Sequence, residues 1–500
     1  MNAILKPTEI KNKDKIINSK VAVYINSASI SLMIDFHAAA IIDLLSRGNK
    51  VTVYLCDRSF KSPMDNPFNR KSIDNYRMFR AKDAIKGLDV RLKIINLRNM
   101  SDKVSNKTAE TLEIGTMSSF ASILKAESKK DLSPKWMCAY NNMLESAKKL
   151  YNYFISEIKN EHYDFVFMFN GRFGCVRPAL EATKDSNIGF GLYEIKKSLH
   201  EIVFINELIH SIEGNTRRAL SCYEANKKEA EISAAKFFER KIESKNTGDP
   251  IYTKDQERGS LPEAIKNTTK KVIAVYPTTE DEYKFIGKEW DGYVPESQLD
   301  EMEKLAISLP QDEYIIVIKM HPNQIFSANN ITEKYLLLGK KYPHVIIETP
   351  LSKKDTYALM NRADVVITFA STIGVEACYA RKPVILIGDT NWGKMDIADK
   401  VYSGTEACEL IKKGIKPKPI LGAIIWGNYI YSYKDALPAL SVAGRGNYFV
   451  NGRRIGRSVI RRILQIPARL EIHVSNPGFF LGTDFFLRTL ETIVSMLRGR

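Results

Sequence analysis

One turn of the chain carries residue types that bind anions. An apolar run that ends at Phe369 leads into Ser371 and Thr372, and a helix is predicted to begin at Ile373. The first N–H groups of a helix have no partner within it, and the helix dipole is positive at that end. The two hydroxyls add donors, and Gly374 would let a ligand approach the backbone. The turn therefore suits the phosphate of a nucleotide-activated substrate.

The same turn has a second interpretation. Ser and Thr are the common N-cap residues, so a capped helix in an ordinary α/β fold fits equally well. The surrounding elements bear on the choice, because apolar runs alternate with helical periodicity after residue 271, which predicts a parallel sheet covered on both faces. The predicted strands are 272–276, 314–319, 345–348, 365–369 and 384–387, and the helices are 296–308, 331–341, 354–362 and 373–380.

Polar residues collect where these predicted strands end. Because the carboxyl ends of parallel strands meet at one edge of a sheet, we expect their side chains to converge on one crevice. The residues are Thr278, Thr279, Glu280, His321, Asn323, Ser371, Thr372 and Glu376.

The first half of the chain has a similar organisation. Strands at 21–25 and 51–55 flank a helix at 30–46, further strands are predicted at 90–97, 165–169 and 188–193, and a long helix at 136–158. Residues 101–130 lack a period and are predicted to be a mobile region near a cleft. The polar residues at the strand ends are Asn26, Ser27, Asn170, Arg172, Arg177 and Glu194. Arg177 could bind a substrate anion or form a structural ion pair with Glu194. His37, two turns into the first helix, suits either a structural role or a contact with substrate.

Composition places the chain among globular proteins. Its 500 residues, 44% of them hydrophobic, predict two or three domains with sizeable cores. Six scattered cysteines without a Cys-x-x-Cys pair indicate reduced thiols, not a disulfide framework or a zinc site. The lysine-rich first twenty residues lack the apolar core of a signal peptide, and no run reaches the roughly 18 apolar residues of a membrane span. A cytoplasmic protein is predicted, soluble or at most on a membrane surface.

The net charge of +16 has several interpretations. It fits nucleic acid, anionic lipid or phosphorylated substrates, and it equally fits a generally lysine-rich proteome. The C-terminus differs, because no Lys follows Lys434 and residues 441–500 carry ten Arg against three acidic residues. At 455–470 and 485–497 the apolar residues form segments that would lie on an anionic membrane or pack across the two domains.

Motifs of several other chemistries are absent from the sequence. It contains no G-x-G-x-x-G, no P-loop and no G-x-S-x-G. It also lacks an Asp-x-Asp pair that would hold a divalent ion on a diphosphate, so metal dependence is not expected.

Four segments taken together resemble a known family. They are Tyr276-Pro-Thr-Thr-Glu-Asp-Glu-Tyr283, Ile318-Lys-Met-His-Pro-Asn323, Asp355-Thr-Tyr-Ala-Leu-Met360 and Ser371-Thr-Ile-Gly-Val-Glu-Ala377. Their order resembles the capsule and surface-polysaccharide biosynthesis proteins of bacteria, which are similar to GT-B glycosyltransferases. Asn170-Gly-Arg172 and Arg177-Pro178 resemble the N-terminal domain of the same group.

The resemblance implies an α/β fold with two Rossmann-like domains facing across a cleft, followed by an Arg-rich C-terminal extension. The implied domains are an acceptor-side domain at 1–214, a helical segment and linker at 215–270, a nucleotide-donor domain at 271–414 and a basic extension at 415–500.

The resemblance also implies roles for individual residues. In the related capsule and teichoic-acid polymerases, the His-Pro histidine and small hydroxyl residues contact the donor phosphate, which gives that role to His321, Ser371 and Thr372. A strand-end histidine that caps a turn is the alternative for His321. The carboxylate of Glu376 would repel a phosphate, but it suits hydrogen bonding to sugar or ribose hydroxyls. The full expected sets are donor-binding Thr278, His321, Asn323, Ser371, Thr372, Gly374 and Glu376, and acceptor-binding Asn170, Arg172 and Arg177.

Glycosyl transfer sets two chemical needs. The departing nucleotide phosphate must be stabilised, and inversion needs a base near the acceptor hydroxyl. Helix N–H groups, hydroxyls and an imidazolium meet the first need without metal, so no cofactor is expected beyond the nucleotide-sugar substrate. The base should come from the facing domain, where Glu194, His37 and Asp35 are the candidates.

The sequence therefore predicts a metal-independent glycosyltransferase. It would move a sugar from a nucleotide-sugar donor to a growing capsular or lipopolysaccharide-type glycan or a lipid-linked acceptor, in the cytoplasm or on the cytoplasmic face of the inner membrane. Two alternatives fit the same fold: transfer of a polyol phosphate, as in teichoic-acid polymerases, and a non-catalytic scaffold of polysaccharide assembly. Nucleic-acid binding rests on charge alone and is not expected.

Overall fold

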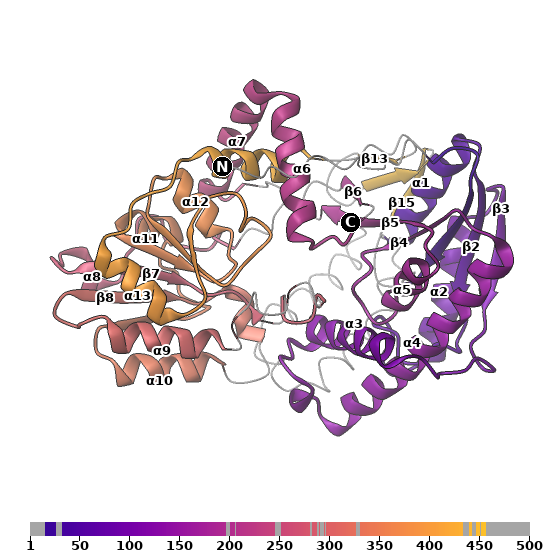
Figure 1. Cartoon of the computed structure of the whole chain (residues 1–500), viewed down its shortest axis with the longest axis horizontal. Coiled ribbons are helices and arrows are strands. Elements are labelled where there is room, and N and C mark those ends of the chain that lie inside the picture. Colours follow the sequence, from indigo (N-terminus) through magenta and orange to yellow (C-terminus); the bar gives the residue numbers. More distant parts are fainter. Residues whose placement is uncertain are drawn as a thin grey trace, which may run out of the picture.

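Two α/β domains lie side by side in the computed structural model (Figure 1). It describes residues 16–26, 33–196, 201–205, 207–245, 252–280, 283–287, 290, 295, 297–326, 331–433, 440–442, 447–450 and 452–456. Each domain is built on a six-stranded sheet, which confirms the predicted α/β class with two Rossmann-like domains. The predicted segment at 485–497 and all but the first two residues of the segment at 455–470 lie outside the described residues.

The first sheet has the strand order β3-β2-β1-β4-β5-β6. Strands β1 to β5 are parallel, and β6 pairs antiparallel with β5. The strands are β1 (Lys20–Ile25), β2 (Lys50–Cys56), β3 (Val90–Ile95), β4 (Phe165–Phe169), β5 (Gly189–Lys196) and β6 (Glu201–Ile205). The helices are α1 (Met33–Ser46), α2 (Lys71–Ala84), α3 (Asn106–Leu124), α4 (Pro134–Glu161) and α5 (Arg177–Asp185).

The prediction of a mobile region at 101–130 is wrong, because most of that stretch forms helix α3. Its N-cap is Ser105, whose side chain accepts a hydrogen bond from the backbone N–H of Thr108. The buried face of α3 contains Gly115 and several Ser and Thr residues, and a Cβ on Gly115 would lie 2.9 Å from Cβ of Arg177. These small and polar residues interrupt the apolar residues of the same face, Leu112, Met117, Phe120, Ala121 and Leu124, and so weaken the hydrophobic periodicity that would reveal the helix.

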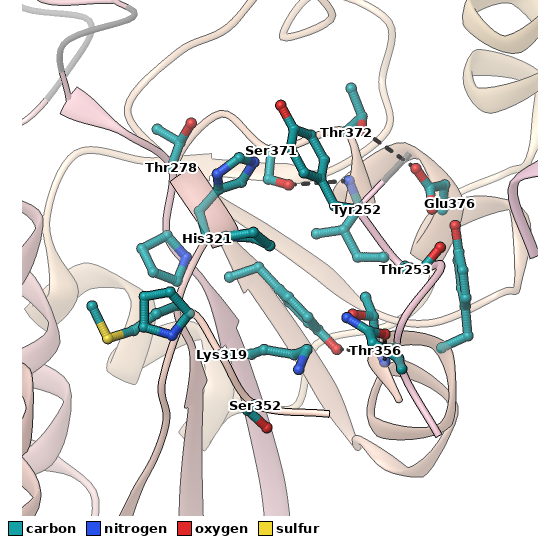
Figure 2. A pocket seen from close by; sticks show the side chains of 18 of the residues that line it. Tyr252, Thr253, Thr278, Lys319, His321, Ser352, Thr356, Ser371, Thr372 and Glu376 are labelled. Atoms are coloured by element: carbon teal, nitrogen blue, oxygen red, sulfur yellow. Dashed lines mark hydrogen bonds between the residues drawn. The ribbon is translucent and has the colours of Figure 1, made fainter. Parts of the chain in front are cut away.

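The second sheet is parallel throughout, with the order β12-β11-β10-β7-β8-β9. Its strands are β7 (Lys271–Tyr276), β8 (Tyr314–Lys319), β9 (Val345–Glu348), β10 (Val365–Thr368), β11 (Val384–Ile387) and β12 (Asp399–Val401). Their predicted positions are confirmed within two residues, except for β12, which was not predicted. The carboxyl ends of β7 to β10 border the pocket drawn in Figure 2.

Side chains of β7 alternate between the two faces of this sheet, as the two-residue period of a strand requires. Val272 and Ala274 belong to one core and Ile273 and Val275 to another. The first core includes residues of α11 (Thr356–Arg362), α12 (Ile373–Tyr379) and α14 (Leu421–Ser432). The second includes residues of α9 (Gln298–Ser308), α10 (Ile331–Lys341) and α13 (Gly404–Lys413).

Helices from distant parts of the chain complete the second domain. Helices α6 (Ile212–Ala225) and α7 (Lys227–Ile242) pack against α14, and Arg218 Nε donates to Tyr429 Oη at 3.0 Å. Phe237 and Trp426 join the same core as the sheet, so the predicted helical segment builds on the second domain. The remaining described elements are α8 (Glu263–Lys266) and an antiparallel sheet of β13 (Leu440–Val442), β14 (Asn447–Val450) and β15 (Arg453–Gly456). None of the described helices is long and apolar enough to cross a membrane.

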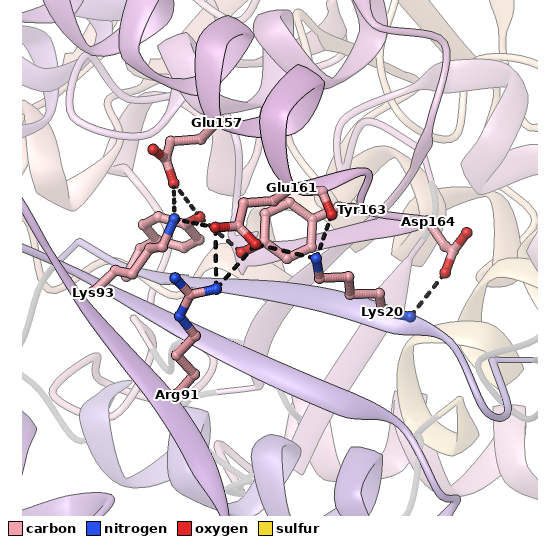
Figure 3. Close-up of polar contacts among 8 residues, drawn as sticks. Lys20, Arg91, Lys93, Glu157, Glu161, Tyr163 and Asp164 are labelled. Carbon is pink, nitrogen blue, oxygen red and sulfur yellow. Dashed lines mark hydrogen bonds and ion pairs between the residues drawn. The ribbon is translucent and has the colours of Figure 1, made fainter.

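A charge cluster fastens the end of α4 to the first sheet (Figure 3). Glu161, the last residue of α4, accepts hydrogen bonds from Lys93 at 2.6 Å, from Lys20 at 3.1 Å and from Arg91 at 3.0 Å. The hydrogen bond from Lys93, followed by that from Lys20, lowers the pKa of Glu161 from 4.5 to about 2. The ionised carboxylate therefore stabilises the contact between α4 and strands β1 and β3.

We predict that Glu161→Gln lowers the free energy of unfolding at pH 7 by about 2 kcal/mol, because charge-assisted hydrogen bonds contribute on that scale. Since the folded-state pKa lies below the unfolded value, this contribution is complete above pH 4.5 and is lost as the pH falls towards 2. Urea unfolding of both proteins between pH 2 and 7 measures the difference. Glu113→Gln is the control, because the Glu113–Lys129 pair is exposed and should contribute less than about 0.5 kcal/mol. A pH-independent difference would contradict the assignment.

Candidate functional site

A cavity of about 590 Å³ lies at the carboxyl edge of the second sheet. This volume falls within the range of small-molecule sites in proteins. The side chains in Figure 2 come from the ends of β7, β8 and β10, from the loop after β9 and from residues 252–256. Of the predicted donor-site residues, the structure brings five to this cavity: Thr278, His321, Ser371, Thr372 and Glu376.

His321 follows β8 and presents its ring to the pocket (Figure 2). The backbone N–H of Asn323 donates to Nδ1 of His321 at 3.1 Å. Because Nδ1 is an acceptor in this network, the neutral ring carries its proton on Nε2. An imidazolium would set two N–H groups against each other, so the structure favours a neutral donor over the predicted imidazolium. Tyr252 holds the ring by an edge-to-face contact, with centroids 4.7 Å apart.

The turn between β10 and α12 is built by its own hydroxyl groups. Thr368 Oγ1 accepts from the backbone N–H of Ser371 at 3.0 Å, and Ser371 Oγ accepts from the N–H of Ile373 at 3.4 Å. The hydroxyl of Thr372 does not cap the helix; it donates to Glu376 Oε1 at 3.3 Å. Helix α12 has seven residues, so its dipole is short, and the hydroxyls are the more substantial donors.

The predicted role of Gly374 is corrected by the structure. Gly374 is buried and does not line the cavity. A Cβ at this position would lie 2.9 Å from Cγ2 of Thr368 and 2.9 Å from the ring of Trp392. Glycine is needed here so that α12 can pack on β10 and Trp392, and not for the approach of a ligand.

Glu376 is a buried carboxylate that lines the cavity one turn into α12. Its exposed fraction is 7%, and Lys241 Nζ from α7 lies 3.8 Å from Oε1. Burial and the nearby Glu376 carboxylate raise the pKa of Tyr357, which keeps the Tyr357 hydroxyl protonated. The wall formed by Glu376, Lys241 and Tyr357 therefore presents a carboxylate, an ammonium and a hydroxyl, a combination that suits the hydroxyls of a sugar.

Asn323 is placed beside the cavity and not in its lining. In addition to its backbone bond to His321, its Nδ2 donates to Tyr252 Oη at 3.0 Å. The structure therefore gives Asn323 a positioning role for His321 and Tyr252, in place of the predicted direct contact.

Sequence reasoning missed several residues that line the cavity: Lys241, Tyr252, Thr253, Lys319, Ser352, Thr356 and Tyr357. Tyr252 and Thr253 fall in the stretch predicted to be a linker, where nothing in the sequence singles them out. Lys319 carried a signal, because a charged residue ends an otherwise apolar strand at 314–319.

On the first domain, Asn170 and Glu194 form a pair at the ends of β4 and β5. Asn170 adopts a φ of +56° and donates through Nδ2 to Glu194 Oε2. With 5% of its surface exposed, Asn170 orients Glu194 and has little surface for an acceptor. Glu194 is half-buried, and its pairing with Asn170 replaces the predicted alternative of a pair with Arg177.

Arg177 is an interdomain contact. It is 2% exposed, its Nη2 donates to the backbone carbonyl of Ile286, and its Nη1 lies 3.5 Å from Glu181. Ile286 belongs to the segment that follows β7 in the second domain. The prediction that Arg177 binds acceptor is therefore corrected, since its guanidinium is buried against protein groups. Arg172 is half-buried, stacks on Phe173 at 4.7 Å and lies 3.5 Å from Ser122 Oγ.

His37 is fully buried in the first domain. Its ring nitrogens contact Tyr193 Oη at 2.7 Å and the carbonyl oxygen of Tyr24 at 3.2 Å. Of the two roles considered for His37, a structural role and a contact with substrate, its position in the core favours the structural one. The same position argues against the predicted role as catalytic base. The side chain of Asp35 lies outside the described residues, as does Ser27.

The chain has two helix-covered sheets, the first parallel except for β6 and the second parallel throughout, with a ligand-sized cavity at the carboxyl edge of the second sheet. These features define the two-domain GT-B class of fold. The resemblance stated from the sequence is thus confirmed at the level of the fold. Within the described residues, no group of three or more His, Cys, Asp or Glu side chains could hold a metal ion.

No family model matches the chain, and no curated protein matches it. Similar solved structures include two of Thermosulfurimonas dismutans KpsC, described as a β-Kdo 2,4 transferase and a β-Kdo 2,7 transferase. The β-Kdo 2,4 transferase shares 13% identity over 61% of this chain and 88% of that chain, with a TM-score of 0.36. The β-Kdo 2,7 transferase shares 15% over 64% and 89%, with a TM-score of 0.35.

A UDP-GlcNAc 2-epimerase of Methanocaldococcus jannaschii, solved with UDP-GlcNAc and UDP, shares 12% identity over 82% of this chain and 98% of that chain, with a TM-score of 0.28. At such low identities and TM-scores, these similarities carry no argument about the activity of this chain.

We predict that Gly374→Ala lowers the free energy of unfolding by about 1–3 kcal/mol, because the new methyl group overpacks the contact between α12, Thr368 and Trp392. Urea unfolding measures the loss. The affinity of the folded fraction for a nucleotide should stay within twofold of the unmodified protein. Unchanged stability with lost affinity would support the ligand-approach role and contradict the packing role.

Proposed function

We propose that this chain is a glycosyltransferase that takes a sugar from a nucleotide-sugar donor and adds it to a growing surface glycan, capsular or lipopolysaccharide-type. One observation carries the proposal: the neutral donor His321, the hydroxyls of Ser371 and Thr372, and the buried carboxylate of Glu376 line one cavity of ligand size. Hydrogen-bond donors and a carboxylate in one cavity match a ligand that has both a phosphate and free hydroxyls.

The proposed division of the donor follows from these groups. The Nε2–H of His321 and the Ser371 hydroxyl bind the phosphate, which becomes the leaving group, because hydrogen-bond donors stabilise the charge that develops on it. Glu376 lies in a wall with Lys241 and accepts hydrogen bonds from sugar or ribose hydroxyls. A carboxylate is poorly suited to contact phosphate directly, so the two roles fall to different walls.

On the acceptor side, Glu194 is the proposed base for the acceptor hydroxyl, and Arg172 is a proposed contact with the acceptor. Glu194 is half-buried, lies at a strand end of the first domain and is oriented by Asn170, as a general base must be. Asp35 remains a second candidate from the sequence. The acceptor is proposed to be a glycan or a lipid-linked glycan, and the site of action the cytoplasm or the cytoplasmic face of the inner membrane.

The first test is binding of nucleotides. A thermal-shift screen with CMP, CDP, UDP and GDP should raise the melting temperature of the full chain for at least one of them, because a ligand that binds the folded state stabilises it. His321→Ala should weaken that binding by about 10-fold or more, the scale of one lost hydrogen bond to a charged group. His344→Ala is the control, since His344 precedes β9 outside this cavity and its loss should leave the affinity unchanged. No shift with any of these nucleotides would overturn the proposal.

The second test is the identity of the product. Turnover with a nucleotide-sugar and a glycan acceptor should give a glycosidic bond, whereas a phosphodiester would support polyol-phosphate transfer and an epimerised nucleotide-sugar would indicate a different reaction. Absence of any turnover with a bound donor would favour a scaffold. The proposal includes independence from divalent ions, so the rate with EDTA should equal the rate with added Mg²⁺; loss of activity in EDTA would contradict this part alone.

A further inference from the structure

Lys319 differs from the other described lysines. It ends β8, lines the cavity and is 7% exposed, and it is the one lysine among the buried polar side chains of the described residues. Two half-buried lysines have acidic partners: Lys241 lies 3.8 Å from Glu376, and Lys93 lies 2.6 Å from Glu157. A buried ammonium without a counter-ion is costly, which makes the absence of a partner informative.

No carboxylate of the described residues forms an ion pair with Lys319. Its Nζ donates one hydrogen bond, at 2.8 Å, to the backbone carbonyl of Lys354, which leaves two N–H groups without a described acceptor. The nearest acids are engaged elsewhere. Asp355 accepts from the backbone N–H groups of Tyr357 and Gly259, and Glu348 accepts from the Ser352 hydroxyl.

Lys319 ends β8, His321 follows it by two residues, and both residues line the cavity. Figure 2 shows both side chains reaching into the cavity from the end of β8. The structure favours a neutral His321, so this residue brings a donor but no charge. The positive charge that a phosphate needs is available from Lys319.

We propose that Lys319 is the charged half of the donor-phosphate site: its ammonium pairs with a phosphate oxygen of the bound nucleotide, while His321 donates a hydrogen bond to the same group. This inference rests on the proposed nucleotide-dependent function and names the residue that neutralises the leaving group. Lys319 was not among the residues predicted from the sequence.

The protonation of Lys319 provides a second line of support. Burial lowers the pKa of Lys319 to about 8, and the charges of Glu348 and Asp355 only partly oppose that effect. The ammonium therefore begins to lose its proton at mildly basic pH, and an anion that binds beside it should raise the pKa of Lys319. The other titratable side chains of the cavity are Lys241, Lys245, Asp255, Tyr252, Tyr276, Tyr283, His321, Lys353, Tyr357 and Glu376.

The experiment compares two ligands that differ only by the phosphate. The probes are the nucleoside monophosphate among CMP, UMP and GMP that gives the largest thermal shift, and its nucleoside, titrated by calorimetry into the full chain. Lys319→Met should weaken binding of the monophosphate by about 10- to 100-fold, the scale of a charge-assisted hydrogen bond, and leave nucleoside binding within twofold. Lys304→Met is the control, because Lys304 is exposed, pairs with Glu301 and lies outside the cavity.

Folding of the variant is checked separately. Because burial opposes the charged form of Lys319, replacement by an uncharged side chain of similar length should leave the melting temperature at pH 7 equal or higher. Lys319→Arg keeps a charge that does not titrate below pH 12 and should retain tighter binding of the monophosphate than of the nucleoside.

The pH dependence gives an independent readout. Between pH 7.5 and 9.5 the phosphate is fully ionised, since its second pKa is about 6. The affinity of the wild-type protein for the monophosphate should therefore fall as the pH rises above about 8, by up to tenfold per unit. The heat of binding should report proton uptake, and Lys319→Arg should show neither effect.

The outcomes separate this inference from the proposed function. If the wild-type protein binds no nucleotide, both the inference on Lys319 and the proposed function are overturned. If it binds the monophosphate but Lys319→Met binds it equally well, or loses monophosphate and nucleoside binding to the same extent, the inference on Lys319 is overturned and the proposed function stands. Selective loss of monophosphate binding, with the flat pH profile of Lys319→Arg, supports it.

Discussion

The site depends on a constraint of parallel sheets: every strand ends at the same edge, so residues far apart in the sequence meet there. In the second domain, β10, β7 and β8 are adjacent in the sheet order. The residues that follow them therefore become neighbours, and Ser371, Thr278 and His321 line one cavity. The apolar strands fix this arrangement, because Val, Ile and Ala side chains on both faces lock the register against two helical layers.

The balance of charge differs from one wall of the cavity to another. Glu376 is buried beside Lys241, so that wall holds opposite charges close together. Around Lys319 the balance differs, because the described acids nearest to it, Asp355 and Glu348, are occupied by backbone N–H and hydroxyl groups. A neutral His321 can donate a directional hydrogen bond but adds no charge. The cavity therefore holds a partly desolvated positive charge at Lys319, as a pre-organised phosphate site requires.

The fold could be predicted from the sequence more accurately than the individual side-chain contacts. Strands such as 272–276 and 314–319 were predictable because short apolar runs that alternate with helical segments are typical of a parallel sheet covered on both faces. Helix α3 was not predicted because Gly115 and several Ser and Thr residues interrupt the apolar residues of its buried face. Gly374 was assigned to a ligand because spacing cannot reveal that Trp392 and Thr368 fill the space beside it. Lys319 was passed over because its lack of a counter-ion is a property of three-dimensional neighbours.

Arg177 shows why the acceptor side was the hardest part to predict. A guanidinium at a strand end has the same appearance in a sequence whether it binds a substrate anion or a backbone carbonyl, and here it binds the carbonyl of Ile286. Three residues before Ile286, Tyr283 lines the cavity, and Trp290 beyond it donates through Nε1 to the carbonyl of His210 at 2.9 Å. One short segment thus forms part of the cavity wall and also contacts the first domain. Arg177 holds that segment, so the two domains are coupled through the wall of the cavity itself.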